Sequence, residues 1–369
     1  MAAHSHHLWP DASFAGQVEC WDDAARLADR KWDRVMGELW PEAQRHVAAE
    51  LGVIKPETIA FAPNTHDFLV RLAAAAPRGN GTPLRVLTSD GEFHSARRQL
   101  ARWEEEGQVL VTRIAAEPFD TFSARFLDAA RAGGHDLMLV SQVLFASGRV
   151  FEHCDELASL AEPSGPWVVI DGYHAFMALS DPFAKPAAKS AFYLGGGYKY
   201  AMAGEGVAFM HCPPGFGERP PVTGWYAEFG DLTAPPGSSV GYTRDAMRFM
   251  GATFDPSALY RFNAVQRMLR TNGLTTAAIS GHVAGLQRQL LAAVADSPLG
   301  RAELLNPLAA QPHARFLAFR SPKAAHWKDR LEEQSCVTDV RGDVLRIGLG
   351  LYHDVGDIDA FAGLALGLD

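Results

Sequence analysis

The sequence is poor in cysteine and contains no long hydrophobic run. Its 369 residues include four cysteines, Cys20, Cys154, Cys212 and Cys336, and no pair of them has CxxC spacing. Scattered thiols of this kind indicate a reduced, cytoplasmic protein rather than a disulfide framework. No apolar run approaches the roughly 20 residues that cross a membrane, and no basic-then-apolar signal opens the sequence. We therefore expect a cytoplasmic protein with no membrane partner.

Positive charge is also scarce. The chain has 34 lysines and arginines against 43 aspartates and glutamates, which gives a formal net charge of -9. This balance argues against a nucleic-acid partner. The one histidine cluster, at His4, Ser5, His6 and His7, offers only weak metal ligands. We expect a flexible N-terminus there and no metal site.

After a helical start, the chain alternates apolar runs with amphipathic stretches. Residues 1–50 have helical spacing, divided into two helices at Pro41, and we expect them to pack with the small domain. In residues 51–255, helical stretches alternate with apolar, strand-like runs at Ile59–Ala62, Leu84–Ser89, Val109–Ile114 and Leu137–Phe145. That alternation is typical of a mostly parallel sheet covered on both faces. Residues 256–369 predict a smaller α+β domain.

An acid and a lysine lie near the ends of neighbouring apolar runs. Asp171 ends the run WVVID, His174 follows it, and Lys199 comes after Gly195–Gly197 and Tyr198. Sites in open α/β sheets lie beyond the carboxyl ends of the strands. A lysine that can form a Schiff base and an acid that can pair with a pyridine nitrogen are what a pyridoxal 5'-phosphate (PLP) site requires. A buried core would explain Asp171 alone equally well, but it explains the glycine-rich run before Lys199 poorly.

Three further stretches fall at the ends of predicted strands. Asn64 or Thr65 caps a predicted helix whose free N–H groups suit a phosphate, although a plain N-cap is the alternative. Phe93 follows a strand and could lie flat on a planar ring. Ser147 ends a strand near the expected edge of the cofactor, and a simple turn explains it equally well. Together these stretches predict one shared site.

An arginine stands inside an apolar strand near the C-terminus. Burying Arg346 in the run VLRIGLG is costly unless its guanidinium meets an anion. A substrate carboxylate would satisfy it with two hydrogen bonds. A structural ion pair with Asp339 or Asp343 is the competing interpretation.

These motifs resemble the class V branch of fold type I PLP-dependent enzymes, and kynureninases in particular. The resembling pieces are IDGYHA with Asp171, GGYKYAMAGEGVAF with Lys199, GWY with Trp225, FMGATFDPSALY with Thr253, and VTDVRGDVLRIGLGLYH with Arg346. The resemblance implies an α/β fold of the PLP-dependent transferase type. Its large domain would contain a mostly parallel sheet of the seven-stranded type, followed by a smaller α+β C-terminal domain.

The resemblance also implies roles for individual residues. Lys199 would be the Schiff-base lysine and proton shuttle, Asp171 would pair with the ring nitrogen, His174 would lie beside the ring, and Phe93 would stack on it. The chain would form a homodimer with shared sites, in which Thr253 reaches the partner's phosphate. The residues implied to surround the phosphate or hold the substrate carboxylate are Asn64, Thr65, Tyr198, Trp225, Thr253 and, for the carboxylate, Arg346.

The kynureninase resemblance implies a PLP-dependent hydrolase. It would act on an amino-acid substrate through an external aldimine, cleave its Cβ–Cγ bond and release alanine. A class V aminotransferase, an epimerase and a β-eliminating lyase of the cysteine desulfurase kind remain alternatives, and a catalytically silent dimeric binding protein is a remote one. A desulfurase needs a nucleophilic cysteine, whereas Cys336 lies in an apolar run typical of a buried thiol. Ala96 stands where kynureninases have an acid.

Overall fold

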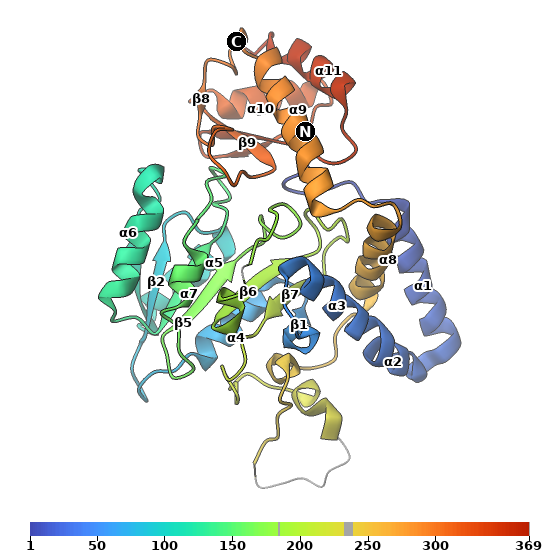
Figure 1. Cartoon of the computed structure of the whole chain (residues 1–369), viewed down its shortest axis with the longest axis vertical. Helices are drawn as coiled ribbons and strands as arrows, with labels where there is room; N and C mark the ends of the chain where they lie inside the picture. The colour runs from blue at the N-terminus through green and yellow to red at the C-terminus, as the bar shows by residue number, and fades with distance from the viewer. Residues whose placement is uncertain (184, 232–238, 369) are drawn as a thin grey trace.

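The computed structural model describes residues 1–183, 185–231 and 239–368. It contains a seven-stranded and a four-stranded sheet, and the smaller sheet lies above the larger along the long axis of the molecule (Figure 1). The Pro- and Gly-rich stretch 213–239, which the sequence predicts to be irregular, lies partly outside the described residues. Short 3-10 segments occur at Pro56–Thr58, Ala187–Lys189, Trp225–Asp231 and Ala246–Phe249.

The large sheet has the order β1-β7-β6-β5-β4-β2-β3. Strands β6, β5, β4, β2 and β3 are parallel, whereas β7 is antiparallel to both of its neighbours. The predicted mostly parallel, seven-stranded sheet is therefore confirmed. The strands are β1 (Ile59–Ala62), β2 (Leu84–Ser89), β3 (Val109–Ile114), β4 (Leu137–Ser141), β5 (Trp167–Asp171), β6 (Ala191–Gly196) and β7 (Ala208–His211).

The central strands are apolar along their whole length because both faces of the sheet are covered. Every residue of β4 and β6 is buried, as are the first four of β5. A helix follows each of the first four strands, so the carboxyl ends of the parallel strands meet at one edge. These helices are α4 (Thr65–Ala75), α5 (His94–Glu105), α6 (Phe119–Ala132) and α7 (Cys154–Ala158).

The N-terminal helices run along one flank of the large sheet (Figure 1). They are α1 (Asp11–Leu27), α2 (Lys31–Arg34) and α3 (Trp40–Leu51), with a π-helical turn at Val35–Leu39 and α1 packed on α8 (Ser257–Thr271). The prediction that Pro41 divides two helices is wrong. Pro41 lies in the first turn of α3, where its missing N–H costs no helical hydrogen bond. The break lies instead at the 3-10 turn Ala28–Arg30.

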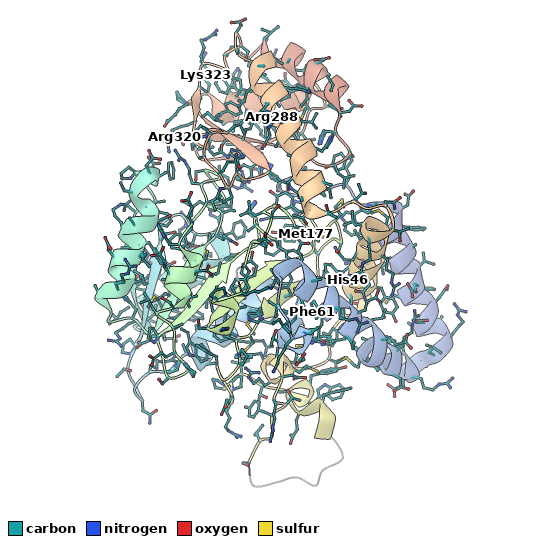
Figure 2. The ribbon with its side chains drawn as sticks, in the orientation of Figure 1. His46, Phe61, Met177, Arg288, Arg320 and Lys323 are labelled. Atoms are coloured by element: carbon teal, nitrogen blue, oxygen red, sulfur yellow. The ribbon has the colours of Figure 1, made fainter. Side chains whose placement is uncertain are left out.

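The C-terminal part is an antiparallel sheet of order β10-β11-β9-β8 covered by helices. Arg320 of β9, labelled in Figure 2, donates a hydrogen bond to Glu117, which lies between β3 and α6 of the large-sheet part. The elements are α9 (Thr276–Ala293), β8 (Glu303–Leu304), β9 (Phe316–Arg320), α10 (Ala324–Glu333), β10 (Asp339–Arg341), β11 (Val344–Gly348) and α11 (Val355–Ala365).

The first residues of the chain dock on this smaller sheet. Ala2 forms a parallel bridge with Gly348, and His4 and His7 are buried. The expectation of a flexible N-terminus is therefore wrong. Among the described residues, no group of histidine, cysteine and acidic side chains is arranged to hold a metal ion. Within the same residues, no helix has the length and hydropathy of a membrane span.

Candidate active site

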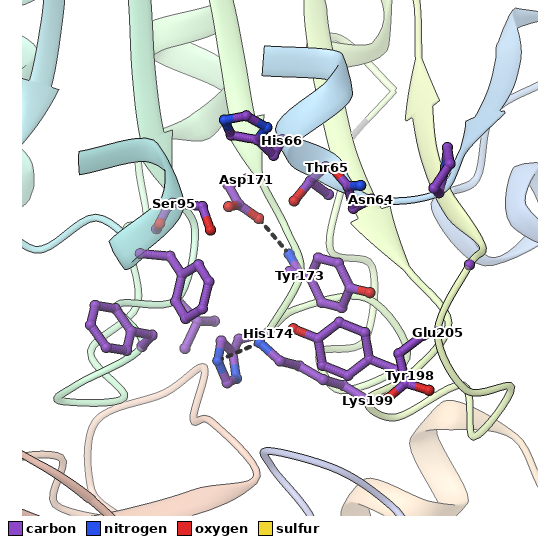
Figure 3. Close-up of a pocket in the computed structure, with 16 residues that line it drawn as sticks. Asn64, Thr65, His66, Ser95, Asp171, Tyr173, His174, Tyr198, Lys199 and Glu205 are labelled. Carbon is purple, nitrogen blue, oxygen red and sulfur yellow. Dashed lines mark hydrogen bonds between the residues drawn. The ribbon is translucent and has the colours of Figure 1, made fainter. Parts of the chain in front are cut away.

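A cavity of about 480 Å³ opens beyond the carboxyl ends of the parallel strands (Figure 3). Its walls come from the N-termini of α4 and α5, the ends of β4 and β5, and the turns that follow β5 and β6. Asp171, His174 and Lys199 all line it. The residues that contain the predicted chemistry therefore meet in one place, as the strand-end rule requires.

Asp171 is the last residue of β5 and lies at the centre of this edge. It pairs in register with Ser141 of β4 on one side and Leu194 of β6 on the other. The Tyr173 N–H donates to its carboxylate at 3.0 Å. Burial raises the pKa of Asp171 above its ordinary value, against the opposing effects of that N–H and of Lys199. A cationic ligand would satisfy this carboxylate.

Lys199 and His174 form a buried pair on the opposite wall. The Lys199 amine lies 2.7 Å from His174 Nε2. Burial lowers the pKa of Lys199 to about 7, because an ammonium is poorly solvated there. Burial, and then the charge of Lys199, hold the pKa of His174 well below its usual range. His174 is therefore a neutral acceptor, and Lys199 titrates where it can act both as an amine and as an ammonium.

Aromatic rings surround the lysine. Its amine lies 4.7, 5.6 and 5.9 Å from the ring centroids of Tyr173, Tyr198 and Phe93. Gly196 serves this packing, because a Cβ at that position would overlap the Tyr173 hydroxyl.

The N-terminus of α4 forms another wall. The Asn64 side chain caps the helix by accepting the Asp67 N–H at 2.9 Å, and Asn64, Thr65 and His66 all line the cavity. His66 is held by Gln99 at 2.9 Å. Free N–H groups and the helix dipole favour an anion at this end. The positive helix end and the acid Asp171 thus face the same cavity.

Ser95 and Ser141 line the cavity, whereas Ser147 does not. Ser147 is buried in the following turn, where its hydroxyl accepts the Arg149 N–H, and it does not line the cavity. The predicted strand ran to Phe145, whereas β4 ends at Ser141, so the serine at its carboxyl end was misassigned. Behind Ser141 lies Glu92, which accepts the Ser141 hydroxyl at 2.5 Å.

Arg346 lies on the smaller sheet and is already paired. It is 2% exposed, donates to Asp339 and to the Phe145 carbonyl, and has no partner for Nε among the described residues. The pair with Asp339 fits the structural interpretation of this arginine, and the Nε–H without a partner fits the interpretation that it holds a carboxylate. Arg341 also pairs with Asp339, at 2.7 Å, which leaves two arginines for one acid.

Trp225 and Thr253 lie outside the cavity of a single chain. The Trp225 indole donates to the Thr253 hydroxyl at 3.3 Å, and Trp225 is 44% exposed. Thr253 lines a separate hollow of about 360 Å³ together with Asp67 and Arg71. Their predicted contact with a phosphate would therefore need a second chain.

Several lining residues were not predicted from the sequence. Tyr173 and Glu205 stand inside the quoted motifs IDGYHA and GGYKYAMAGEGVAF, and Ser95 lies in the first turn of α5, two residues after Phe93. The strand-end rule could have found Ser141. The histidine cluster at the start of the chain did not predict the place of His4, whose pKa is lowered in part by the charge of Lys199 and which in turn lowers the pKa of His174.

Comparison of the sequence with known proteins finds similarity to two isopenicillin N epimerases. No protein-family model matches the chain. It is 28% identical over 372 residues to isopenicillin N epimerase of Streptomyces clavuligerus, an alignment that covers 92% of this chain and 87% of that protein. It is 29% identical over 214 residues to isopenicillin N epimerase of Amycolatopsis lactamdurans, covering 54% of this chain and 52% of that protein. The kynureninase resemblance is not shown by these relatives.

Solved structures match nearly the whole chain. The apo cysteine desulfurase of Thermococcus onnurineus NA1 superposes with a TM-score of 0.81 at 17% identity, over 99% of this chain and 93% of that one. A mutant of C-DES with glycine covalently linked to its PLP cofactor gives a TM-score of 0.77 at 16% identity, over 99% and 95%. The chain therefore has the α/β fold of the fold type I PLP-dependent enzymes, which these proteins share.

Proposed function

We propose that the chain is a PLP-dependent enzyme that removes the Cα proton of an amino-acid substrate. The observation that supports this most directly is Lys199, a buried lysine whose pKa is lowered to about 7. It lies in one cavity with Asp171, an acid that forms no ion pair among the described residues. C-DES, which shares the fold, holds glycine covalently linked to its PLP cofactor in one solved structure.

The residues of the cavity fit this cofactor. Asp171 would hold the pyridinium, Lys199 the aldehyde carbon, and the N-terminus of α4 at Asn64 and Thr65 the phosphate. Phe93 lines the same cavity and offers a ring face. When bound, PLP supplies an electron sink that stabilises negative charge at the substrate Cα.

The chain's own groups then move the proton. Lys199, as a neutral amine near pH 7, is the base, and His174 accepts a hydrogen bond from it at 2.7 Å and keeps it oriented. Because His174 is held neutral by burial, it does not repel the ammonium that Lys199 becomes. The low pKa of Lys199 lets the same group return the proton.

Among the outcomes after proton removal, we favour delivery of a proton to the opposite face of Cα, which inverts its configuration and is epimerisation. The relatives named isopenicillin N epimerase support this choice. Kynureninase-like hydrolysis is less well supported, because Ala96 stands where kynureninases have an acid. Desulfuration is disfavoured because none of the four cysteines lines the cavity, and burial raises the pKa of Cys154 and Cys212 to about 12.

The experiment is proton exchange followed by product analysis. PLP-loaded enzyme in D2O is mixed with L-amino acids, and loss of the Cα–H signal is followed by NMR. Exchange that disappears in Lys199→Ala supports the proposal, and a chiral assay then identifies the D-isomer. Alanine with an aromatic acid from kynurenine would favour hydrolysis instead, and a keto acid would favour transamination. Absence of a lysine-bound cofactor spectrum would contradict the proposal altogether.

We also propose that the enzyme is a homodimer with shared sites. The position of Trp225 and Thr253 outside the single-chain cavity supports this. If it is correct, mixing inactive Lys199→Ala chains with Thr253→Ala chains restores part of the activity in hybrid dimers. A monomer by light scattering, or no complementation, would contradict it.

A further inference from the structure

The N-terminal segment extends the smaller sheet next to Arg346. The Ala3 N–H donates to the Gly348 carbonyl at 3.3 Å, and the Gly348 N–H donates to the Met1 carbonyl at 2.9 Å. This pairing continues β11 beyond the end of β10, which faces only Val344–Arg346. The backbone therefore delivers His4 to the interior of the molecule.

His4 occupies the place that a side chain on Gly348 would fill. A Cβ there would overlap His4 Nδ1 and lie 2.6 Å from the His4 backbone nitrogen. Residues two apart on a strand point to the same face, so His4 lies on the face that carries Arg346. Phe316, the partner of Gly348 in β9, stacks on His4 at 4.9 Å and lies 5.6 Å from the His174 ring. His4 thus belongs to the layer that faces the lysine site.

His4 is fully buried with both ring nitrogens unpartnered among the described residues. A buried polar group without a partner is costly, so packing alone does not account for a histidine here. Burial, and then the charge of Arg346, hold the pKa of His4 well below its usual range. The ring is therefore neutral, with one N–H to donate. The nearest charged acceptor is Asp339, whose Oδ2 lies 3.8 Å from His4 Nε2.

The same carboxylate oxygen of Asp339 accepts from Arg346. A carboxylate that arrives at Arg346 must compete with Asp339 for the guanidinium, and two acids in contact repel each other. Arg341, at 2.7 Å, holds the other oxygen of Asp339. His4 is the group placed to satisfy the oxygen that Arg346 releases.

We propose that His4 is a positioning residue for recognition of the substrate α-carboxylate: it donates to Asp339 when Arg346 turns to the substrate. This rests on the proposed function, because it assumes that an amino acid reaches Arg346. His4 acts through Asp339 and Arg346 and contacts neither the substrate nor the reacting atoms. Its effect is therefore confined to ligands that carry a carboxylate.

The test compares an amino acid with its decarboxylated counterpart. PLP-loaded wild type, His4→Phe and His4→Gln are titrated with L-alanine and with ethylamine, and the dissociation constants are read from the shift of the cofactor absorbance. The phenyl ring of His4→Phe still stacks on Phe316 and fills the space beside Gly348, but it cannot donate a hydrogen bond. His4→Gln places an amide donor near Nε2. Melting temperatures of the cofactor-free proteins report on folding.

We expect His4→Phe to weaken L-alanine binding about tenfold, the effect of one hydrogen bond to a charged group, with ethylamine unchanged and His4→Gln intermediate. Equal weakening of both ligands, or no change in either, would overturn the inference and leave the proposed function intact. A wild-type spectrum that responds to ethylamine but not to L-alanine would overturn it too. A wild-type spectrum that responds to neither would overturn the proposed function with it.

Discussion

The carboxyl edge of the large sheet and the facing layer of the smaller sheet are built on different principles. At the first, Asp171 and Lys199 come from consecutive strand-and-turn units, and the acid has no arginine partner among the described residues. In the second, His4, Asp339 and Arg346 come from opposite ends of the chain, and the charges are already paired. In the first region these charged side chains have no partner of opposite charge within ion-pair distance in the part of the chain that the structure describes. In the second region the acid and the arginines form ion pairs with one another.

The largest expected effect tests the first region. Lys199→Ala should lower turnover about a thousandfold or more, because a positioned base is lost, while the free energy of unfolding stays the same or rises because a buried amine is removed. Steady-state rates and urea unfolding measure the two quantities. Lys323→Ala, on the exposed start of α10, is the control. A large loss of stability in Lys199→Ala would contradict the view that this lysine serves activity rather than folding.

The second region should respond in the opposite way. Asp339→Ala removes the acid between Arg341 and Arg346 and should lower the free energy of unfolding by about 3–5 kcal/mol, because a buried cation is left uncompensated. Glu117→Ala breaks the exposed pair with Arg320 and should cost less than about 1 kcal/mol. Urea unfolding of both variants measures this. Equal effects would mean that the buried pair contributes no more than a surface one.

The pH dependence of stability tests a buried acid of the first region, Glu92, which accepts a hydrogen bond from Ser141 at the end of β4. Burial raises the pKa of Glu92 from 4.5 to about 7, so between these values the folded state binds a proton that the unfolded state lacks. Unfolding free energy attributable to this group therefore falls as pH rises from about 4.5 to 7, by roughly 3 kcal/mol in all. Glu92→Gln should remove that slope. Cofactor-free wild type and variant, unfolded in urea across pH 5 to 8, give the difference.

The smallest expected effect concerns the docking of the N-terminus. Gly348→Ala places a methyl group where His4 lies and should cost about 1–3 kcal/mol of stability through overpacking. Gly363→Ala, in α11 with nothing within 4 Å of the added carbon, should be neutral or stabilising by about 0.5–1 kcal/mol. Thermal unfolding compares the two. A harmless Gly348→Ala would show that the N-terminal segment does not fill that space.

Local patterns predicted the elements that lie wholly within the large sheet. The runs proposed for β1, β2 and β3 match the observed strands, because turns or polar residues bound each apolar run. The prediction failed where an apolar run continues past the end of a strand. Phe145 and its neighbours are buried against other elements after β4 has ended, so hydrophobicity alone could not tell strand from buried turn.

The sequence by itself determined the alternating strands and helices, the position of Asp171 at a strand end and the glycine-rich approach to Lys199, because these depend on residues close together in the chain. Only the tertiary structure decided which serines line the cavity, and that His4 lies beside the pair of Arg346 and Asp339. His4 and Asp339 are more than 300 positions apart in the chain, and such contacts leave no local periodicity. They depend on how the smaller sheet packs over the carboxyl edge of the larger one.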